Sequence, residues 1–231
     1  METLVQCDFR REFPIFPLRQ TVMFPHSVVP LHIFEPRYRQ MLDDALDRVG
    51  QLVTATTHPH AEEEGPNDPP PLLPVGCVGQ IVDHERLPDG RYNILLQGLC
   101  RVEIEELNEA TDERLYRLGR LSPVVDSEAE QHDRPEARDL IRIALQGPGI
   151  GRMSMADDLQ SLLDREEAPL DAIVDLLAHP LLRENRDRSE YLSLATLPER
   201  MALLLRTMRH INAAALRMTE DQESDSPEAE N

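Results

Sequence analysis

The spacing of apolar residues changes its period partway along the chain, and this change limits the fold more than any other feature. Up to about residue 125, apolar residues come in short runs at 13–18, 28–34, 51–56, 76–86, 92–96, 100–106 and 115–125, and prolines break the first two of these runs. Such runs are typical of β-strands, edge or barrel strands in particular. From about residue 134 the apolar residues recur every three or four positions, which is the helical period. The sequence therefore predicts an α+β protein, without alternating parallel βαβ units.

One helix and one hairpin are expected within the β part. Pro36 suits the first turn of a helix, where its missing N–H group costs nothing, and Gly50 suits the position after the end of that helix. The apolar face of this helix would consist of Tyr38, Met41, Leu42, Ala45, Leu46 and Val49. Asp89-Gly90 lies between two strand-like runs, and this dipeptide strongly favours a hairpin because both residues tolerate positive φ.

The second part carries apolar stripes that no helix could bury alone, so a helical bundle is expected. The stripes are Leu140, Ile141, Ala144 and Leu145; Leu159, Leu162 and Leu163; Leu170, Ile173, Val174 and Leu177; and, in a long last helix from about Pro198, Met201, Leu204, Leu205, Met208, Ile211 and Ala215. The domain boundaries predicted from these patterns are 13–125 for the β part and 134–218 for the bundle. Residues 219–231 hold six acidic residues and no basic residue, which predicts a disordered acidic tail.

Charge and lysine content exclude several kinds of function. The formal charge is −19, which argues against nucleic-acid binding, because phosphate groups are bound by a surplus of positive charge. All 24 basic residues are arginine. A Walker A phosphate loop, a Schiff-base lysine and a Ser-Lys dyad all require a lysine ammonium group, so none of these can be formed by this sequence.

The cysteines and histidines predict no metal site, cofactor or disulfide. Cys7, Cys77 and Cys100 are odd in number and form no C-x-x-C pair, which favours inert thiols in a reducing cytoplasm. No signal peptide and no membrane-spanning run is evident. His58 and His60 adjoin the acidic residues 62–64, but nothing in the sequence fixes a ligand geometry there.

Two further candidates are read as structural. Residues 147–151 (GPGIG) form the only glycine cluster, but no Lys-Ser/Thr follows it, so a turn between helices is preferred to a phosphate site. Ser154 lacks the G-x-S-x-G surroundings of a nucleophile, and no histidine is placed by sequence to activate it.

Two segments carry a resemblance to a known family. Residues 17–25 (PLRQTVMFP) are followed by residues 30–38 (PLHIFEPRY), and a second segment runs from residue 76 (GCVG) through 87–92 (LPDGRY) to 96–101 (LQGLCR). With a looser match at residues 194–205, these motifs resemble the LON substrate-binding domain over about residues 13–215. The resemblance implies a PUA-like twisted β-barrel followed by a helical bundle. In Lon proteases such a domain is N-terminal and helps to capture protein substrates, whereas the ATPase and the Ser-Lys protease lie in other modules.

The resemblance suggests a non-catalytic interaction module for protein quality control. It would bind unfolded or extended polypeptides in an apolar groove between the β part and the bundle, with a barrel edge pairing to the main chain. A Lon-type protease acting in trans is a further candidate partner, whereas nucleic acids and membranes are not. The proposed rim of the groove is Arg19, Arg37, Tyr38, Arg91 and Tyr92.

The motifs also give expectations for single side chains, and two alternative functions stay open. Arg37 is expected to pair with Glu35 or a barrel carboxylate, and the rings of Phe24 and Phe34 are expected to fill the barrel interior. One alternative is a PUA-like RNA-binding protein, for which Arg114, Arg117 and Arg120 would have to supply a basic face. The other is an unrecognised small enzyme, which would need a pocket with convergent polar groups.

Overall fold

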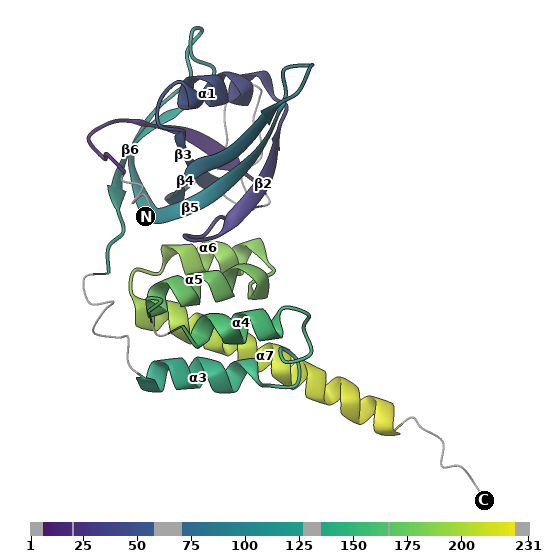
Figure 1. Cartoon of the computed structure of the whole chain (residues 1–231). Helices are drawn as coiled ribbons and strands as arrows, with labels where there is room; N and C mark the ends of the chain where they lie inside the picture. The colour runs from purple at the N-terminus through teal and green to yellow at the C-terminus, as the bar shows by residue number, and fades with distance from the viewer. Residues whose placement is uncertain (1–6, 20, 58–70, 127–134, 166, 225–231) are drawn as a thin grey trace, which may run out of the picture. The chain divides into compact units, whose positions relative to one another are not determined.

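The structure, a computed structural model, describes residues 7–19, 21–57, 71–126, 135–165 and 167–224. The chain divides into two compact units (Figure 1). The β unit contains the chain up to Val125 and also Arg183–Ser193, and the helical unit contains Asp126–Leu182 and the chain from Leu194 onward. The segment 183–193 therefore groups with the β unit, although its place in the sequence is among the helices.

The β unit is built on one sheet with six strands in the described residues. The strands are β1 Phe13–Leu18, β2 Val28–Ile33, β3 Gln51–Thr57, β4 Leu72–Arg86, β5 Tyr92–Asn108 and β6 Leu118–Pro123. Their order is β2-β5-β4-β3-β1-β6, and β5 also pairs with β6. Five strands (β5, β4, β3, β1 and β6) therefore form a closed ring, and the predicted α+β fold with a β-barrel and one inserted helix is confirmed (Figure 1).

The length of β5 makes this closure possible. The sequence suggested separate strands at 92–96 and 100–106, but β5 is continuous over 17 residues. One of its edges pairs with β4. Along its other edge, residues 92–97 pair with β2, and residues 102–108 pair with β6. A strand has only two edges, so a shorter β5 could not hold all three partners.

The barrel interior is one apolar cluster with members from every strand of the ring. These residues are Phe13 and Ile15 on β1, Val53 and Ala55 on β3, Val78 on β4, Val102 on β5 and Leu121 on β6. Each is at most 3% exposed, so the sheet encloses a packed core.

The two phenylalanines of the proline-rich motifs differ in burial. Phe24 is fully buried, although its ring is not part of the interior cluster, and Phe34 is 60% exposed. The expectation that both rings fill the interior is therefore wrong for Phe34. Ile33 ends β2 and is buried, and successive residues of an extended chain point to opposite faces, so Phe34 points outward.

Helix α1 (Pro36–Leu46) lies across one end of the barrel (Figure 1). Pro36 occupies its first turn, and the buried face consists of Tyr38, Met41, Leu42 and Ala45. The helix ends at Leu46, and therefore Val49, which was expected on the buried face, is 57% exposed. The predicted hairpin is present between β4 and β5, with Gly90 at φ +81°.

The helical unit contains α3 (Pro135–Leu145), α4 (Ala156–Leu163), α5 (Leu170–Leu181) and α7 (Leu197–Ser224), whereas α6 (Asn185–Ser193) belongs to the β unit. In the β unit, Tyr191 of α6 packs against Phe24, with 4.9 Å between ring centroids. Most predicted stripe residues are buried, but Leu140 is 54% exposed. Helix α7 reaches Ser224, so residues 219–224 of the expected disordered tail are helical, and residues 225–231 lie outside the described residues.

A buried ion pair joins α5 to α7. Arg200 Nη1 lies 2.5 Å from Asp175 Oδ1, and the two side chains are 3% and 5% exposed. Apolar periodicity gave no signal for this pair, because it identifies the apolar face of a helix and not the partners of its charged residues.

The glycine cluster at residues 147–151 is the turn between α3 and α4, as preferred from the sequence. Its backbone N–H groups at Gly149 and Ile150 both donate to Asn212 Oδ1 of α7, each at 3.0 Å. Asn212 Nδ2 in turn donates to Ala144 O at 2.8 Å. A Cβ on Gly147 would lie 2.0 Å from Asn212 Nδ2, which explains the glycine there. The N–H groups that a phosphate would need are thus already bonded within the protein.

Arg200→Met is expected to destabilise the helical unit by about 3–5 kcal/mol, because it leaves the Asp175 carboxylate buried without its cation. Asp175→Leu combined with Arg200→Met should recover most of that loss, since neither charge is then buried alone. Urea unfolding followed by circular dichroism measures both effects. If Arg200→Met alone were as stable as the parent, the pair would not be buried as described.

Asn212→Ala is expected to cost the helical unit about 2 kcal/mol or more, because two N–H groups of the turn lose their acceptor. Asn212→Asp is the matched control, since it keeps an acceptor for both groups and loses only the donation to Ala144. In thermal unfolding, the parent should have the highest melting temperature, Asn212→Asp an intermediate one and Asn212→Ala the lowest. The reverse order for the two variants would contradict the role of Asn212 as acceptor.

Candidate functional site

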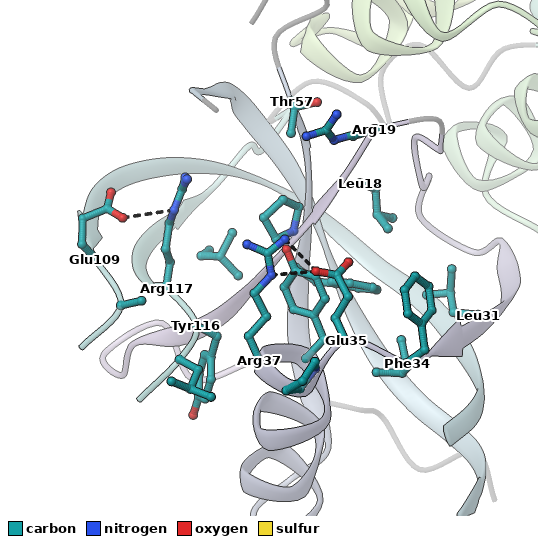
Figure 2. A pocket seen from close by; sticks show the side chains of 18 of the residues that line it. Leu18, Arg19, Leu31, Phe34, Glu35, Arg37, Thr57, Glu109, Tyr116 and Arg117 are labelled. Atoms are coloured by element: carbon teal, nitrogen blue, oxygen red, sulfur yellow. Dashed lines mark hydrogen bonds and ion pairs between the residues drawn. The ribbon is translucent and has the colours of Figure 1, made fainter. Parts of the chain in front are cut away.

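A groove of about 1080 Å³ lies on the β unit, where β1 and β2 end and the chain turns into α1 (Figure 2). This volume is at or beyond the upper end of what a single small ligand needs. The lining comes from four parts of the chain and from one residue of β3: residues 15–19, residues 31–38, residues 109–112, residues 115–117 and Thr57.

Apolar side chains form one side of the groove. Leu18 and Leu31 are half-buried in it, and the ring of Phe34 stands largely exposed at its border (Figure 2). Phe16 and Tyr38 meet edge to face beneath, with 4.8 Å between ring centroids. A large exposed aromatic ring beside other apolar side chains is a feature of binding surfaces.

A charged pair stands at the start of α1 in the same groove. Arg37 Nη2 lies 2.7 Å from Glu35 Oε2, which confirms the expected pairing, and Arg37 Nε donates to the same oxygen at 2.9 Å. The Arg37 guanidinium also lies over the Tyr38 ring, 4.6 Å from its centroid. Burial raises the pKa of Tyr38, with Arg37 acting weakly in the opposite direction, so its hydroxyl is neutral at physiological pH.

The facing wall is the loop between β5 and β6, which is held by its own arginines. Arg114 Nη2 donates to Glu109 O at 2.6 Å, and its Nε donates to Tyr116 O at 2.9 Å. Arg117, whose side chain is 7% exposed, lies 3.2 Å from the Glu109 carboxylate. The loop therefore forms a fixed wall built from internal hydrogen bonds.

Helix α1 anchors this wall to the rest of the β unit. Gln40 Nε2 donates to Glu113 O, and Gln40 Oε1 accepts from the Leu115 N–H, both at 2.7 Å. Tyr116 donates its hydroxyl to Asp44 at 2.7 Å. Burial and that carboxylate together raise the pKa of Tyr116, so it remains a hydrogen-bond donor. Both walls of the groove thus depend on α1.

The structure brings together three of the five predicted rim residues. Arg19, Arg37 and Tyr38 line the groove, whereas Arg91 and Tyr92 do not. Tyr92 is 3% exposed and donates its hydroxyl to Asp43 of α1. Arg91 pairs with Asp89 at 2.7 Å, and its Nη1 lies 3.2 Å from Nε2 of His32, which borders the groove.

Phe34 and the residue 109–117 loop were missed by reasoning from the sequence. Phe34 could have been found, because strand alternation after a buried Ile33 places it outside. The loop could not, since about 70 residues separate it from α1 and its polar residues carry no motif.

The remaining sequence candidates lie elsewhere. His58, His60 and residues 62–64 fall outside the described residues. Ser154 is exposed in the turn before α4. The guanidinium groups of Arg114 and Arg117 are engaged in the contacts given above, which gives the RNA alternative no support.

The fold and the groove define a β-barrel binding domain accompanied by a helical unit. Residues 12–210 match the family described as the ATP-dependent protease La (LON) substrate-binding domain. The chain therefore belongs to the LON substrate-binding domain family.

Full-length relatives are much longer than the chain. The Lon protease of Escherichia coli K12 is 28% identical over 204 residues, which are 86% of this chain and 25% of that protein. Lon protease 2 of Myxococcus xanthus is 28% identical over 173 residues, 75% of this chain and 19% of that protein. The chain thus spans about a quarter or less of the length of these curated relatives.

Solved structures agree on the fold. A Lon N-terminal domain protein from Xanthomonas campestris superimposes with a TM-score of 0.60 at 20% identity, covering 85% of this chain and 98% of that one. The N-terminal domain of the Lon protease of the Mycobacterium avium complex superimposes with a TM-score of 0.64 at 17% identity. The match covers 86% of this chain and 98% of that one. Among the helices that the structure describes, none has the length and apolar character to cross a bilayer.

Gln40→Ala is expected to loosen the loop wall, because the Leu115 amide loses its acceptor. Hydrogen exchange at Leu115 should accelerate on the order of tenfold. Gln40→Glu is the matched control, since it keeps an oxygen for Leu115 and loses only the donation to Glu113. Unchanged exchange at Leu115 in Gln40→Ala would show that α1 does not hold the loop.

Proposed function

We propose that this chain binds unfolded or extended polypeptide segments in the groove of its β unit, as a non-catalytic module of protein quality control. The groove beside the exposed Phe34 is the observation that carries the proposal. Membership of a family described as substrate-binding supports it. The groove lies wholly within the β unit, so binding needs no contribution from the helical unit.

The lining suits a peptide better than a small metabolite. Leu18, Leu31 and Phe34 offer apolar contact to hydrophobic side chains that an unfolded protein exposes. Glu35 and Arg37 are 37% and 43% exposed, so polar atoms of a bound main chain can reach them. An apolar surface with few polar groups gives weak and broad recognition, as substrate capture requires.

The open edge of the sheet is a less suitable place for the same ligand. Strand β2 pairs with β5 alone among the described strands. Its sequence contains Pro30, which has no N–H group to donate. Proline on an edge strand hinders the addition of another strand. Side-chain contacts in the groove, with little main-chain pairing, therefore best account for peptide binding.

The contacts of the polar side chains that line the groove give the enzyme alternative no support. Its two tyrosines, Tyr38 and Tyr116, both have a raised pKa and stay neutral, and Arg37 and Arg117 lie beside carboxylates. A Lon-type protease acting in trans would be the natural recipient of captured polypeptides.

Fluorescence anisotropy with labelled peptides from an unfolded protein tests the proposal. Phe34→Ser should weaken binding about tenfold or more, since it removes a large apolar contact. Val82→Ser is the matched control, because Val82 is 49% exposed on the same unit but does not line the groove. Both variants should fold, since the replaced side chains are exposed.

No binding by the folded parent at high micromolar concentration would count against the proposal. So would equal binding by the parent and Phe34→Ser. A salt-dependent gel shift with structured RNA, in the absence of peptide binding, would favour the RNA alternative.

A further inference from the structure

Two cysteines far apart in the sequence meet at the surface of the barrel. Cys7 precedes β1 and Cys100 lies in β5, and the two side chains are close enough for each to shift the pKa of the other. Both pack against the barrel cluster of Phe13, Val78 and their neighbours, and both are partly exposed. No disulfide joins them. The expectation of scattered, inert thiols did not foresee this pair, because only closure of the barrel brings the two segments together.

The surroundings of Cys7 favour its thiolate. The Cys100 thiol donates to it, and the Arg11 guanidinium adds a favourable charge, so the pKa of Cys7 falls to about 7 although burial opposes the change. Arg11 is itself fixed: its Nη2 donates to Gln51 Oε1 at 2.5 Å, and it lies over the Phe13 ring at 4.2 Å.

Cys100 has the complementary role of donor. Its contact with Cys7, its burial and the neighbouring Cys77 all raise its pKa, so it keeps its proton while Cys7 is ionised. One ionised thiol beside one protonated thiol is the arrangement of an attacking and a resolving cysteine.

Cys77 provides an internal contrast. It lies in β4, is completely buried, and points its Sγ at Val78 O at a distance of 3.5 Å. An oxidant reaches partly exposed thiols far more readily than a completely buried thiol.

We propose that Cys7 and Cys100 form a redox modification site, in which a peroxide joins the two Sγ atoms in a reversible intramolecular disulfide. The Cys7 thiolate attacks one oxygen of hydrogen peroxide, the O–O bond breaks, and the departing hydroxide takes up a proton as water. The resulting Cys7 sulfenic acid is then attacked by Cys100 Sγ. The S–S bond forms, and the hydroxyl leaves as a second water with the Cys100 proton.

The electrons balance, since the two thiols lose two electrons and the peroxide gains two. A dithiol reductant reverses the reaction.

The disulfide would tie the segment before β1 to β5, the strand that closes the ring. A cross-link over more than 90 residues of chain restricts the unfolded state, so the oxidised β unit should melt at a higher temperature. The proposal does not depend on peptide binding.

The test uses the full chain, reduced and then treated with stoichiometric hydrogen peroxide, and blocked with N-ethylmaleimide. Trypsin separates the three cysteines into peptides 1–10, 49–86 and 92–101. We expect a non-reduced map in which peptide 1–10 is joined to 92–101, while 49–86 stays unlinked. Dithiothreitol should return both peptides, and the melting temperature should fall with reduction.

Variants separate the roles of the three thiols. Cys77→Ser is the matched control and should form the same linkage as the parent. Cys100→Ser should leave Cys7 as sulfenic or sulfinic acid, and Cys7→Ser should give no linkage. The parent alone decides the question if a variant does not fold. Three results would each overturn the proposal. They are a disulfide between two chains, a linkage through Cys77, and oxidation of Cys7 in the parent without linkage to Cys100.

Discussion

The β unit depends on the pairing of one long strand with three partners. Strand β5 carries β4 along one edge and β2 followed by β6 along the other. Without the contact between β5 and β6, the sheet would be open and the seven-residue interior cluster would lose one side. Because each ring strand contributes to that cluster, strand pairing and core burial stabilise the same closed arrangement.

The groove follows from this closure and from the helix inserted after β2. The ends of β1 and β2 meet the start of α1, and the loop that joins β5 to β6 is tied back to α1 through Gln40 and Asp44. A rigid barrel thus positions irregular segments around an apolar surface, a common way to build a binding site. The same closure brings Cys7 beside Cys100, so the groove and the thiol pair have one structural origin.

The sequence predicted the class of fold because its patterns are local. Short apolar runs marked the strands, Pro36 and Gly50 marked the helix, and Asp89-Gly90 marked the hairpin. Patterns of this kind could not show that β5 is continuous past Gly98, or that Asp175 and Arg200 pair inside the helical unit, because these features depend on tertiary contacts. At the site, Arg19, Arg37 and Tyr38 of one motif line the groove of the β unit, whereas the groove expected from the sequence lay between the β part and the bundle. The loop at residues 109–117 and the thiol pair required the chain to close on itself.

The most direct test of a peptide-binding barrel is to map amide chemical shifts while an unlabelled, extended apolar peptide is added to the isotopically labelled chain. We expect the shifts to concentrate at Leu18, Phe34, Arg37 and Thr111, with the amides of α3 and α4 unchanged. Shifts confined to the helical unit, or none at a saturating peptide concentration, would contradict the assignment of substrate capture to the groove of the barrel.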